Sequence, residues 1–208
     1  MKDYSNYHNI NTKAKIVSDG RKILLHALEN GFESEEVLID NVPTKAILQS
    51  KYSDKDGDSR NILAESGTIH RGSLVTKTDG IWLVTGLPTD NGIYEKAILE
   101  MCNAEVTINL QAVKTLIGHD SKGRPIYEYI DQPINLPAIV EKTNVVESMN
   151  DSINVDEDRV KVTIPYYDLD TVNYFTVYNE KHTVMSRDKT KSLNGVGLLI
   201  LIGERSTD

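Results

Sequence analysis

The sequence predicts a mainly β protein, in which an N-terminal helix precedes a small β-barrel that C-terminal strands elaborate. Three observations favour this fold class. Short runs of β-branched and aromatic residues recur along most of the 208 residues, with turn signals about every 8–12 residues. Apolar residues at helical spacing are convincing only in residues 11–30. Trp82, the single tryptophan, stands in the most apolar short run, which is typical of the core of a small closed sheet.

The order of these patterns divides the chain into three parts. Residues 1–32 form an arm and the helix, residues 33–110 form the central β-barrel, and residues 111–208 form a β-rich C-terminal region. A chain of this length is able to bury a core without disulfide bonds. We see no internal repeat at a solenoid period.

The N-terminal helix is predicted from apolar residues three, four and seven positions apart. Ile16, Ile23 and Ala27 fall near one face, with Val17, Leu24 and Leu28 beside them. Asn30-Gly31 is a typical left-handed helix stop. The apolar face is expected to dock either on the protein's own sheet or on a neighbouring subunit.

The strands are predicted from alternation and from turn chemistry. Asp40-Asn41 separates two early strands, and Asp79-Gly80 joins residues 72–76 to residues 81–85 as a hairpin. Residues 111–117 and 125–130 are predicted to form an exposed hairpin with a tyrosine face, around a turn at residues 119–123. Residues 160–164 alternate cleanly, and residues 195–202 read as a buried strand.

Composition limits the functional classes. The formal net charge is -8 and the sequence pI is about 5.2, which argues against a phosphate-binding protein. Cys102 is the only cysteine, so an intramolecular disulfide is impossible. The longest apolar run, residues 196–202, is much shorter than the ~20 residues of a membrane-spanning helix. We therefore expect no membrane association and synthesis in the cytoplasm.

One local motif resembles a calcium loop. Asp54, Asp56, Asp58 and Glu65 occupy positions that carry carboxylate ligands in an EF-hand loop. However, Ser59 stands where the sharp turn requires glycine, and the flanking segments are not helical in pattern. A solvated acidic turn explains the same residues, so we assign no metal ligand and keep this loop as a weak candidate.

The sequence shows no catalytic constellation. No histidine pairs with another, or with Cys102, at a zinc-ligand spacing. Cys102 is interpreted as a small packing residue, although a Cys–His nucleophile pair stays open as an alternative. The chain has no nucleophile elbow and no phosphate-binding glycine loop. We expect no enzymatic activity and no cofactor.

Tyrosine is the dominant aromatic residue, with ten copies. Tyrosine is frequent at protein interfaces, but it also favours strands. The two explanations stay open for the C-terminal tyrosines, which are Tyr127, Tyr129, Tyr166, Tyr167, Tyr174 and Tyr178.

A longer pattern runs through the central region: a Gly-Ser-Leu-Val run, an Asp-Gly turn, Ile-Trp-Leu-Val-Thr, Asp-Asn-Gly-Ile-Tyr and Met-Cys-Asn. This order resembles the neck proteins of long-tailed bacteriophages, the head–tail connector or head-closure group. The matching positions are Gly72, Trp82, Leu83, Val84, Asn91, Ile93, Tyr94, Cys102 and Asn103. That group commonly has a tryptophan soon after the Cys-Asn pair, whereas this chain has Thr107-Ile108-Asn109. Residues 111–208 are similar to the group only in general character.

The resemblance implies a structural virion protein that assembles in the bacterial host cytoplasm. Such proteins form a ring of identical subunits between the portal or adaptor protein and the tail proteins. The ring lines or closes the DNA channel, and the DNA passes without specific binding. Two alternatives stay open: a β-sandwich module that binds calcium or carbohydrate, and a small enzyme that uses Cys102 or a histidine.

Overall fold

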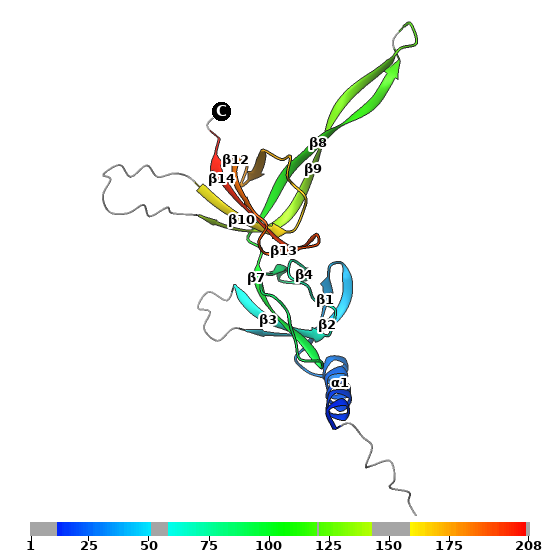
Figure 1. Cartoon of the computed structure of the whole chain (residues 1–208), viewed down its shortest axis with the longest axis vertical. Coiled ribbons are helices and arrows are strands. Elements are labelled where there is room, and N and C mark those ends of the chain that lie inside the picture. The colour runs from blue at the N-terminus through cyan, green and yellow to red at the C-terminus, as the bar shows by residue number, and fades with distance from the viewer. Residues whose placement is uncertain (1–11, 51–57, 120, 143–158, 207–208) are drawn as a thin grey trace, which may run out of the picture. The chain divides into compact units, whose positions relative to one another are not determined.

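The computed structural model describes residues 12–50, 58–119, 121–142 and 159–206 (Figure 1). The chain divides into two compact units, Met1–Met101 and Cys102–Asp208, and each has its own hydrophobic core. No helix among the described residues combines the length and the apolar character needed to span a bilayer.

Unit 1 is a helix followed by a closed antiparallel barrel. Its elements are α1 (Thr12–Asn30), β1 (Ser34–Ile39), β2 (Val42–Ser50), β3 (Ser59–Glu65), β4 (Leu74–Lys77), β5 (Gly80–Val84), β6 (Thr89–Asp90) and β7 (Tyr94–Met101). The strand order is β3-β2-β1-β4-β5-β7, and pairing of β7 with β3 closes the sheet on itself. The short strand β6 pairs with β7 outside this ring of six strands. A mainly β fold with an N-terminal helix and a barrel is therefore confirmed.

Unit 2 is a second closed barrel. Its elements are β8 (Ala104–His119), β9 (Pro125–Lys142), β10 (Arg159–Pro165), β11 (Tyr174–Val177), β12 (Glu180–Asp188), β13 (Ser192–Leu193) and β14 (Val196–Arg205). The order is β10-β9-β8-β11-β12-β14, and β14 pairs with β10 to close the ring. The C-terminal strands thus build a barrel of their own. The boundary placed after residue 110 from the sequence falls inside β8, whereas the division between the two units comes between Met101 and Cys102.

Alternating side chains fill the barrel of unit 1. Val37 and Ile39 of β1 point inward with Ile62 and Ala64 of β3, because successive residues of a strand face opposite sides. Trp82 is only 2% exposed and belongs to the same core cluster. The sequence-based placement of Trp82 in the interior of a closed sheet is confirmed.

The core of unit 2 is packed around an aromatic pair. The rings of Phe175 and His182 stack with centroids 5.4 Å apart. Val106, Ile108 and Leu201 lie in the same buried cluster. His182 is 2% exposed, and its Nδ1 lies 3.0 Å from the carbonyl oxygen of Glu180. His182 is therefore a packing residue, and its Nδ1 has a backbone partner.

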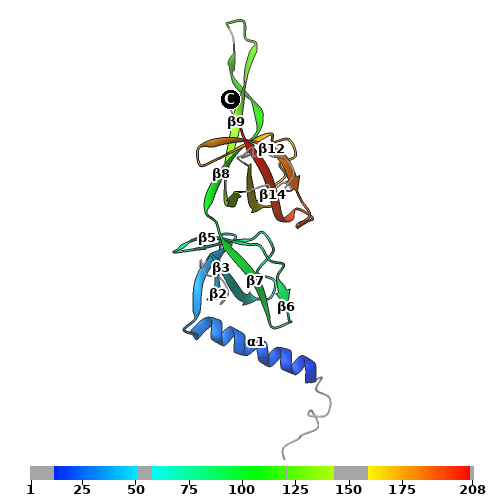
Figure 2. The ribbon, with the colours of Figure 1, turned by 90° about the vertical axis from the view of Figure 1, so that its left-hand side faces the viewer.

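The helix α1 docks on unit 1, where it contacts β1, β2 and β3 (Figure 2). Leu24 and Leu28 are buried, and Arg21 Nε donates a 2.8 Å hydrogen bond to the Gly92 carbonyl. Ile16 and Ile23, predicted on the apolar face, are instead exposed. The buried stripe is therefore the one of Leu24 and Leu28, which the sequence placed beside the predicted face.

The end of α1 differs from the predicted left-handed stop. The helix does end at Asn30, but neither Asn30 nor Gly31 has a positive φ. A Cβ atom on Gly31 would lie 2.2 Å from the carbonyl oxygen of Ala27, to which the Gly31 amide donates. Glycine is needed here for close backbone approach rather than for left-handed geometry.

Candidate interaction surfaces

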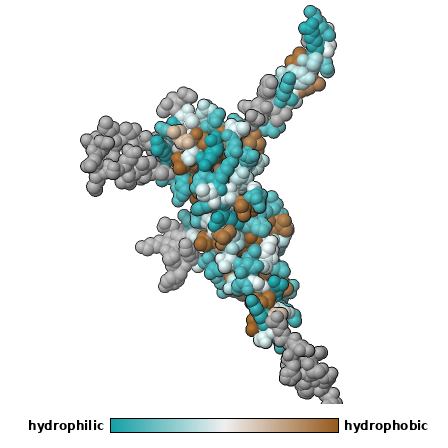
Figure 3. Space-filling view, viewed as in Figure 1, coloured by the Kyte–Doolittle hydropathy of each residue, from teal (hydrophilic) through white to brown (hydrophobic). Residues whose placement is uncertain are grey.

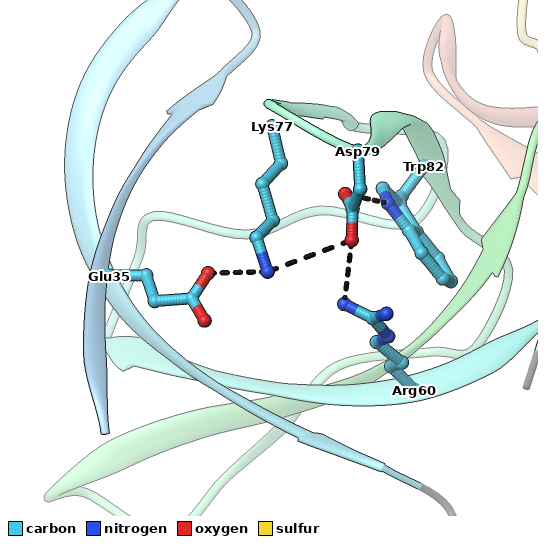
Figure 4. A network of polar contacts seen from close by, with 5 residues as sticks. All are labelled: Glu35, Arg60, Lys77, Asp79 and Trp82. Carbon is cyan, nitrogen blue, oxygen red and sulfur yellow. Dashed lines mark hydrogen bonds and ion pairs between the residues drawn. The ribbon is translucent and has the colours of Figure 1, made fainter. Parts of the chain in front are cut away.

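One end of the unit 1 barrel carries a group of charged side chains, which we call the ionic cluster: Glu35, Arg60, Lys77 and Asp79 (Figure 4). Glu35, Arg60 and Lys77 continue the inward-facing side chains of β1, β3 and β4. Asp79 lies in the β4–β5 turn. Lys77 Nζ is 2.6 Å from Glu35 Oε2 and 3.7 Å from Asp79 Oδ2, while Arg60 Nη1 is 3.0 Å from Asp79 Oδ2. The cluster thus covers the end of the apolar core with paired charges.

Trp82 connects the ionic cluster to the core. Its indole Nε1 donates a 3.2 Å hydrogen bond to Asp79 Oδ1. The guanidinium carbon of Arg60 lies 4.5 Å from the centre of the indole ring, which is the geometry of a cation–π contact. A buried tryptophan needs an acceptor for its N–H, and the turn residue Asp79 supplies it.

The pKa of Asp79 is below its ordinary value of 3.8. Partial burial is the largest single influence and acts in the opposite direction. The hydrogen bond from Trp82 and the positive charges of Lys77 and Arg60 together outweigh it. Asp79 is therefore ionised at neutral pH, with its charge matched by two cations, which leaves it unsuited to act as a general base.

The second surface is the distal part of the β8–β9 hairpin, residues 109–133, which we call the arm (Figure 1). Pairing of β8 with β11 ends at Ile108, and β9 pairs with β10 only from Ile139 onward. Within the arm, the described pairings of β8 and β9 are with each other, interrupted by two irregularities in register. The arm is thus a two-stranded ribbon that extends beyond the barrel.

The arm exposes apolar side chains to solvent. Figure 3 shows hydrophobic residues interleaved with hydrophilic ones along it. Leu116 is 50% exposed, Ile117 55%, Ile126 43% and Tyr127 48%, and Lys114 Nζ lies 4.3 Å from the Tyr127 ring centre. A two-stranded ribbon alone is marginally stable in water, and its stability increases when a partner buries such side chains. These features are typical of a contact element.

A shallow hollow of about 390 Å³ lies on unit 2 beside β8 and β11. Thr107, Asn109, Tyr174 and Lys181 are among its lining residues. Hydroxyl, amide and aromatic groups are the chemistry that binds carbohydrate. However, Lys181 Nζ lies 4.3 Å from the Tyr174 ring centre, so one face of this ring already has a cation–π partner.

The structure does not bring the described residues of the weak calcium-loop candidate together. Asp54 and Asp56 lie outside the described residues. Asp58 precedes β3 and Glu65 ends it, so at about 3.3 Å per residue they are roughly 20 Å apart. Those two carboxylates do not share one ion. Among the described residues, no three metal-binding side chains gather at one place.

Cys102 does not have the environment of a nucleophile. Burial raises the pKa of its thiol to about 12, whereas reactive cysteines have a lowered pKa. Of the tyrosines considered as interface residues, Tyr127, Tyr167, Tyr174 and Tyr178 are exposed. Tyr166 is half-buried, and nothing is described for the side chain of Tyr129.

Sequence reasoning did not identify the ionic cluster, although its turn residue Asp79 was part of the predicted Asp-Gly hairpin. The signal is a charged residue at an inward position of each of three strands, at Glu35, Arg60 and Lys77. This signal is recognisable only once the strand register is known. In the sequence alone, a charged residue at the end of an apolar run is taken to mark where the strand ends.

Comparison with known proteins covers both units. Residues 6–101 match the YomX N-terminal domain, and residues 89–204 match the YomX C-terminal domain. The chain is 34% identical over 212 residues to the SPbeta prophage-derived uncharacterized protein YomX of Bacillus subtilis strain 168, covering 92% of this chain and 98% of that relative. No solved structure matches the chain. The chain is therefore phage-derived and belongs to the YomX family.

Proposed function

We propose that this protein is a structural component of the phage neck, which forms a ring of identical subunits between the portal and the tail. The observation that carries the proposal is the arm, a ribbon with exposed apolar residues that the barrel does not use. Its phage origin and the neck-like pattern of residues 33–110 support the same assignment. The partners are further copies of the chain, a portal or adaptor protein, and tail proteins.

The arm supplies what a ring contact requires. Its two strands each have an outer edge, and an open strand edge pairs readily with another chain. Docking against a neighbouring subunit buries Leu116, Ile126 and Tyr127, and each buried apolar side chain contributes favourably. A ring of identical subunits repeats one such contact around its axis.

The charge of the chain suits a channel through which DNA slides. Protein affinity for duplex DNA comes mainly from lysine and arginine at phosphates. This chain has a formal net charge of -8, and in the ionic cluster both cations already have carboxylate partners. We therefore assign DNA passage without specific binding.

The experiment is to localise the protein in phage particles released from a host that carries its gene. Gold-labelled antibodies raised against the purified chain are expected to label the junction of head and tail in negative-stain images. Label confined to the tail tip or the capsid surface, or particles that lack the protein, would contradict the proposal.

A second experiment tests the arm itself. The double variant Leu116→Ser and Tyr127→Ser removes two exposed apolar contacts from the arm without touching the core. We expect it to fold normally but to be lost from particles. The matched control is Leu193→Ser with Tyr178→Ser, which changes the same residue types at sites in unit 2 outside the arm that are at least as exposed. The control is expected to incorporate like the unaltered chain, and equal incorporation of both variants would refute the role of the arm.

A further inference from the structure

The two barrels have the same strand order. Numbered within its own unit, each barrel has the order third, second, first, fourth, fifth, last, and the last strand closes on the third. In each unit an additional short strand, β6 or β13, pairs with the last strand. A shared strand order is weak evidence that two barrels are related, because few orders satisfy short connections. A shared strand register is much more specific.

The hairpin of the fourth and fifth strands has the same register in both units. Val75 pairs with Trp82 in unit 1, and Phe175 pairs with His182 in unit 2. The residue before the fourth strand accepts the same cross-strand hydrogen bond in each. Val84 donates to the Ser73 carbonyl at 3.0 Å, and Val184 donates to the Asn173 carbonyl at 2.8 Å.

The remaining five pairings fit the same correspondence of residues. In unit 1 the pairs are Ile39↔Val75, Trp82↔Met101, Ser59↔Glu100, Leu48↔Ile62 and Glu35↔Ala46. In unit 2 they are Ile108↔Phe175, His182↔Arg205, Arg159↔Glu204, Val140↔Val162 and Ala104↔Ala138. Each residue in these pairs has one counterpart, and a residue that takes part in two of the pairs has the same counterpart in both.

Burial follows the same correspondence. Ala46 and Ala138 are counterparts, and neither is exposed at all. Ile62 and Val162 are counterparts and are also fully buried. A slip of one residue in any strand would turn its side chains to the other face, so agreement in all six registers requires each strand to be placed alike.

From this agreement we infer that the chain contains two copies of one six-stranded barrel module, produced by internal duplication. The inference does not depend on a role in the phage neck. The same correspondence of residues also explains the position of the arm in the chain. In the first copy, the turn Asp40-Asn41 joins the paired residues Ile39 and Val42. Their counterparts Ile108 and Ile134 are likewise paired, and the whole arm stands between them. The arm is an insertion at the first turn of the second copy.

The two copies fill the same interior differently. Val75 and Leu99 of unit 1 correspond to Phe175 and Gly203 of unit 2. A Cβ atom on Gly203 would lie 2.4 Å from Cζ of Phe175, so the ring occupies the space that a side chain at residue 203 would take. A large and a small residue have exchanged places, which preserves the packed volume.

The first test removes the insertion from the full chain. Residues 109–133 are replaced by the dipeptide Asp-Asn, so that the second copy acquires the turn of the first. We expect the amides of β10, β12 and β14 to keep their protection against hydrogen exchange. Loss of that protection would overturn the inference. Because the readout is folding, failure here is distinct from failure of the neck assignment, for which the readout is location in particles.

The second test uses the exchanged pair. Gly203→Ala alone is expected to lower the protection of β12 and β14, because the new methyl group meets the Phe175 ring. In a Phe175→Val background the same change is expected to lower protection much less, because the second copy then resembles the first. Equal losses in the two backgrounds would show that the two cores are not equivalent and would overturn the inference.

Discussion

Asp79 is the residue that connects the ionic cluster to the core of the unit 1 barrel. It accepts a hydrogen bond from the buried indole of Trp82 and pairs with both Arg60 and Lys77. Its carboxylate therefore fixes the β4–β5 turn to the core and to β3 at once. Such a residue links local turn geometry to the packing of the barrel.

The lowered pKa of Asp79 predicts how unit 1 responds to acid. A carboxyl group whose pKa is lower in the folded than in the unfolded protein stabilises the fold fully above its unfolded value. That stabilisation is lost as the pH falls from about 4 through the folded pKa. We expect the Tm of unit 1 to fall in this range in the unaltered chain and to fall less in Asp79→Asn, measured by thermal unfolding between pH 7 and pH 2. Identical pH profiles for the two proteins would contradict the role given to Asp79.

The Cys102 thiol is expected to be unreactive in the folded protein. With a pKa of about 12, only about one thiol in ten thousand is ionised at pH 8. Alkylation by iodoacetamide, followed by mass spectrometry, should be far slower in native buffer than in urea. Cys102→Ser is expected to leave incorporation into particles unchanged, and fast labelling of the native protein would revive the Cys–His alternative.

At the residue scale, the sequence predicted Trp82 well and its partners poorly. A single tryptophan in an apolar run of a small β protein is expected to be buried in the core. Asp79 was expected only as a turn former, because its contacts with Arg60 and Lys77 depend on strands that are distant along the chain. Side-chain pairing between strands is decided by register, which local patterns do not contain.

At the element scale, the ionic cluster has an apolar counterpart. The positions of Glu35, Arg60 and Lys77 correspond to Ala104, Val160 and Val177 in unit 2. Val160 and Ala104 pack against the core there, and Val177 is buried. The same end of the module is therefore closed by apolar contacts in one copy and by ion pairs in the other, so the charges are not a requirement of the fold.

This comparison predicts the effect of replacing the ionic cluster. The variant Glu35→Ala, Arg60→Val, Lys77→Val and Asp79→Asn is expected to be as stable as the unaltered chain or more stable, in urea unfolding at neutral pH. Apolar replacement of a whole ion-pair network is often neutral or stabilising. The amide oxygen that Asp79→Asn introduces would keep an acceptor for the indole.

The matched control is Lys77→Val alone. It leaves Glu35 without the cation that pairs with it at 2.6 Å, and it removes one of the two cations of Asp79. This variant is expected to be less stable than the fourfold variant. If the fourfold variant were the less stable, the ionic cluster would be essential to the barrel.

The sequence predicted the hairpins as elements but not their lengths. Turns at Asp40-Asn41 and between β4 and β5 were found because they have strong local chemistry. The arm was predicted as an exposed hairpin of residues 111–117 and 125–130 around a turn at 119–123, which is shorter than the observed strands β8 and β9. Irregularities between Leu110 and Val113 and between Leu116 and Gly118 interrupt the alternation by which a long strand is recognised.

At the scale of the whole molecule, each unit has a separate core, and the described members of the two clusters do not overlap. We therefore expect Trp82→Ala to destabilise unit 1 by about 3–5 kcal/mol, the cost typical of removing a buried aromatic side chain. Calorimetry of the full chain should show one transition at a lower temperature and the other unchanged. A single transition that moves as a whole would show that the two units unfold together.

The second barrel could not be predicted from the sequence because its core residues differ from those of the first. Trp82 corresponds to His182 and Ala97 to Leu201, so no repeated motif is visible. What the copies share is the pairing pattern of the backbone, and this is a property of the folded sheet. Strands of unit 2 such as residues 160–164 and 195–202 were therefore recognised individually, but not as parts of a closed barrel.

The paired residues Ile108 and Ile134 have a consequence for how such a phage protein diversifies. If the second barrel accepts the short turn of the first, the segment between them is replaceable without disturbing the barrel, and recombination between related phages is then free to exchange it as a cassette. Adaptation to a new assembly partner then requires a change in one short stretch of the gene. Among relatives, length variation should accordingly concentrate at residues 109–133, while the spacing of the flanking strands stays constant.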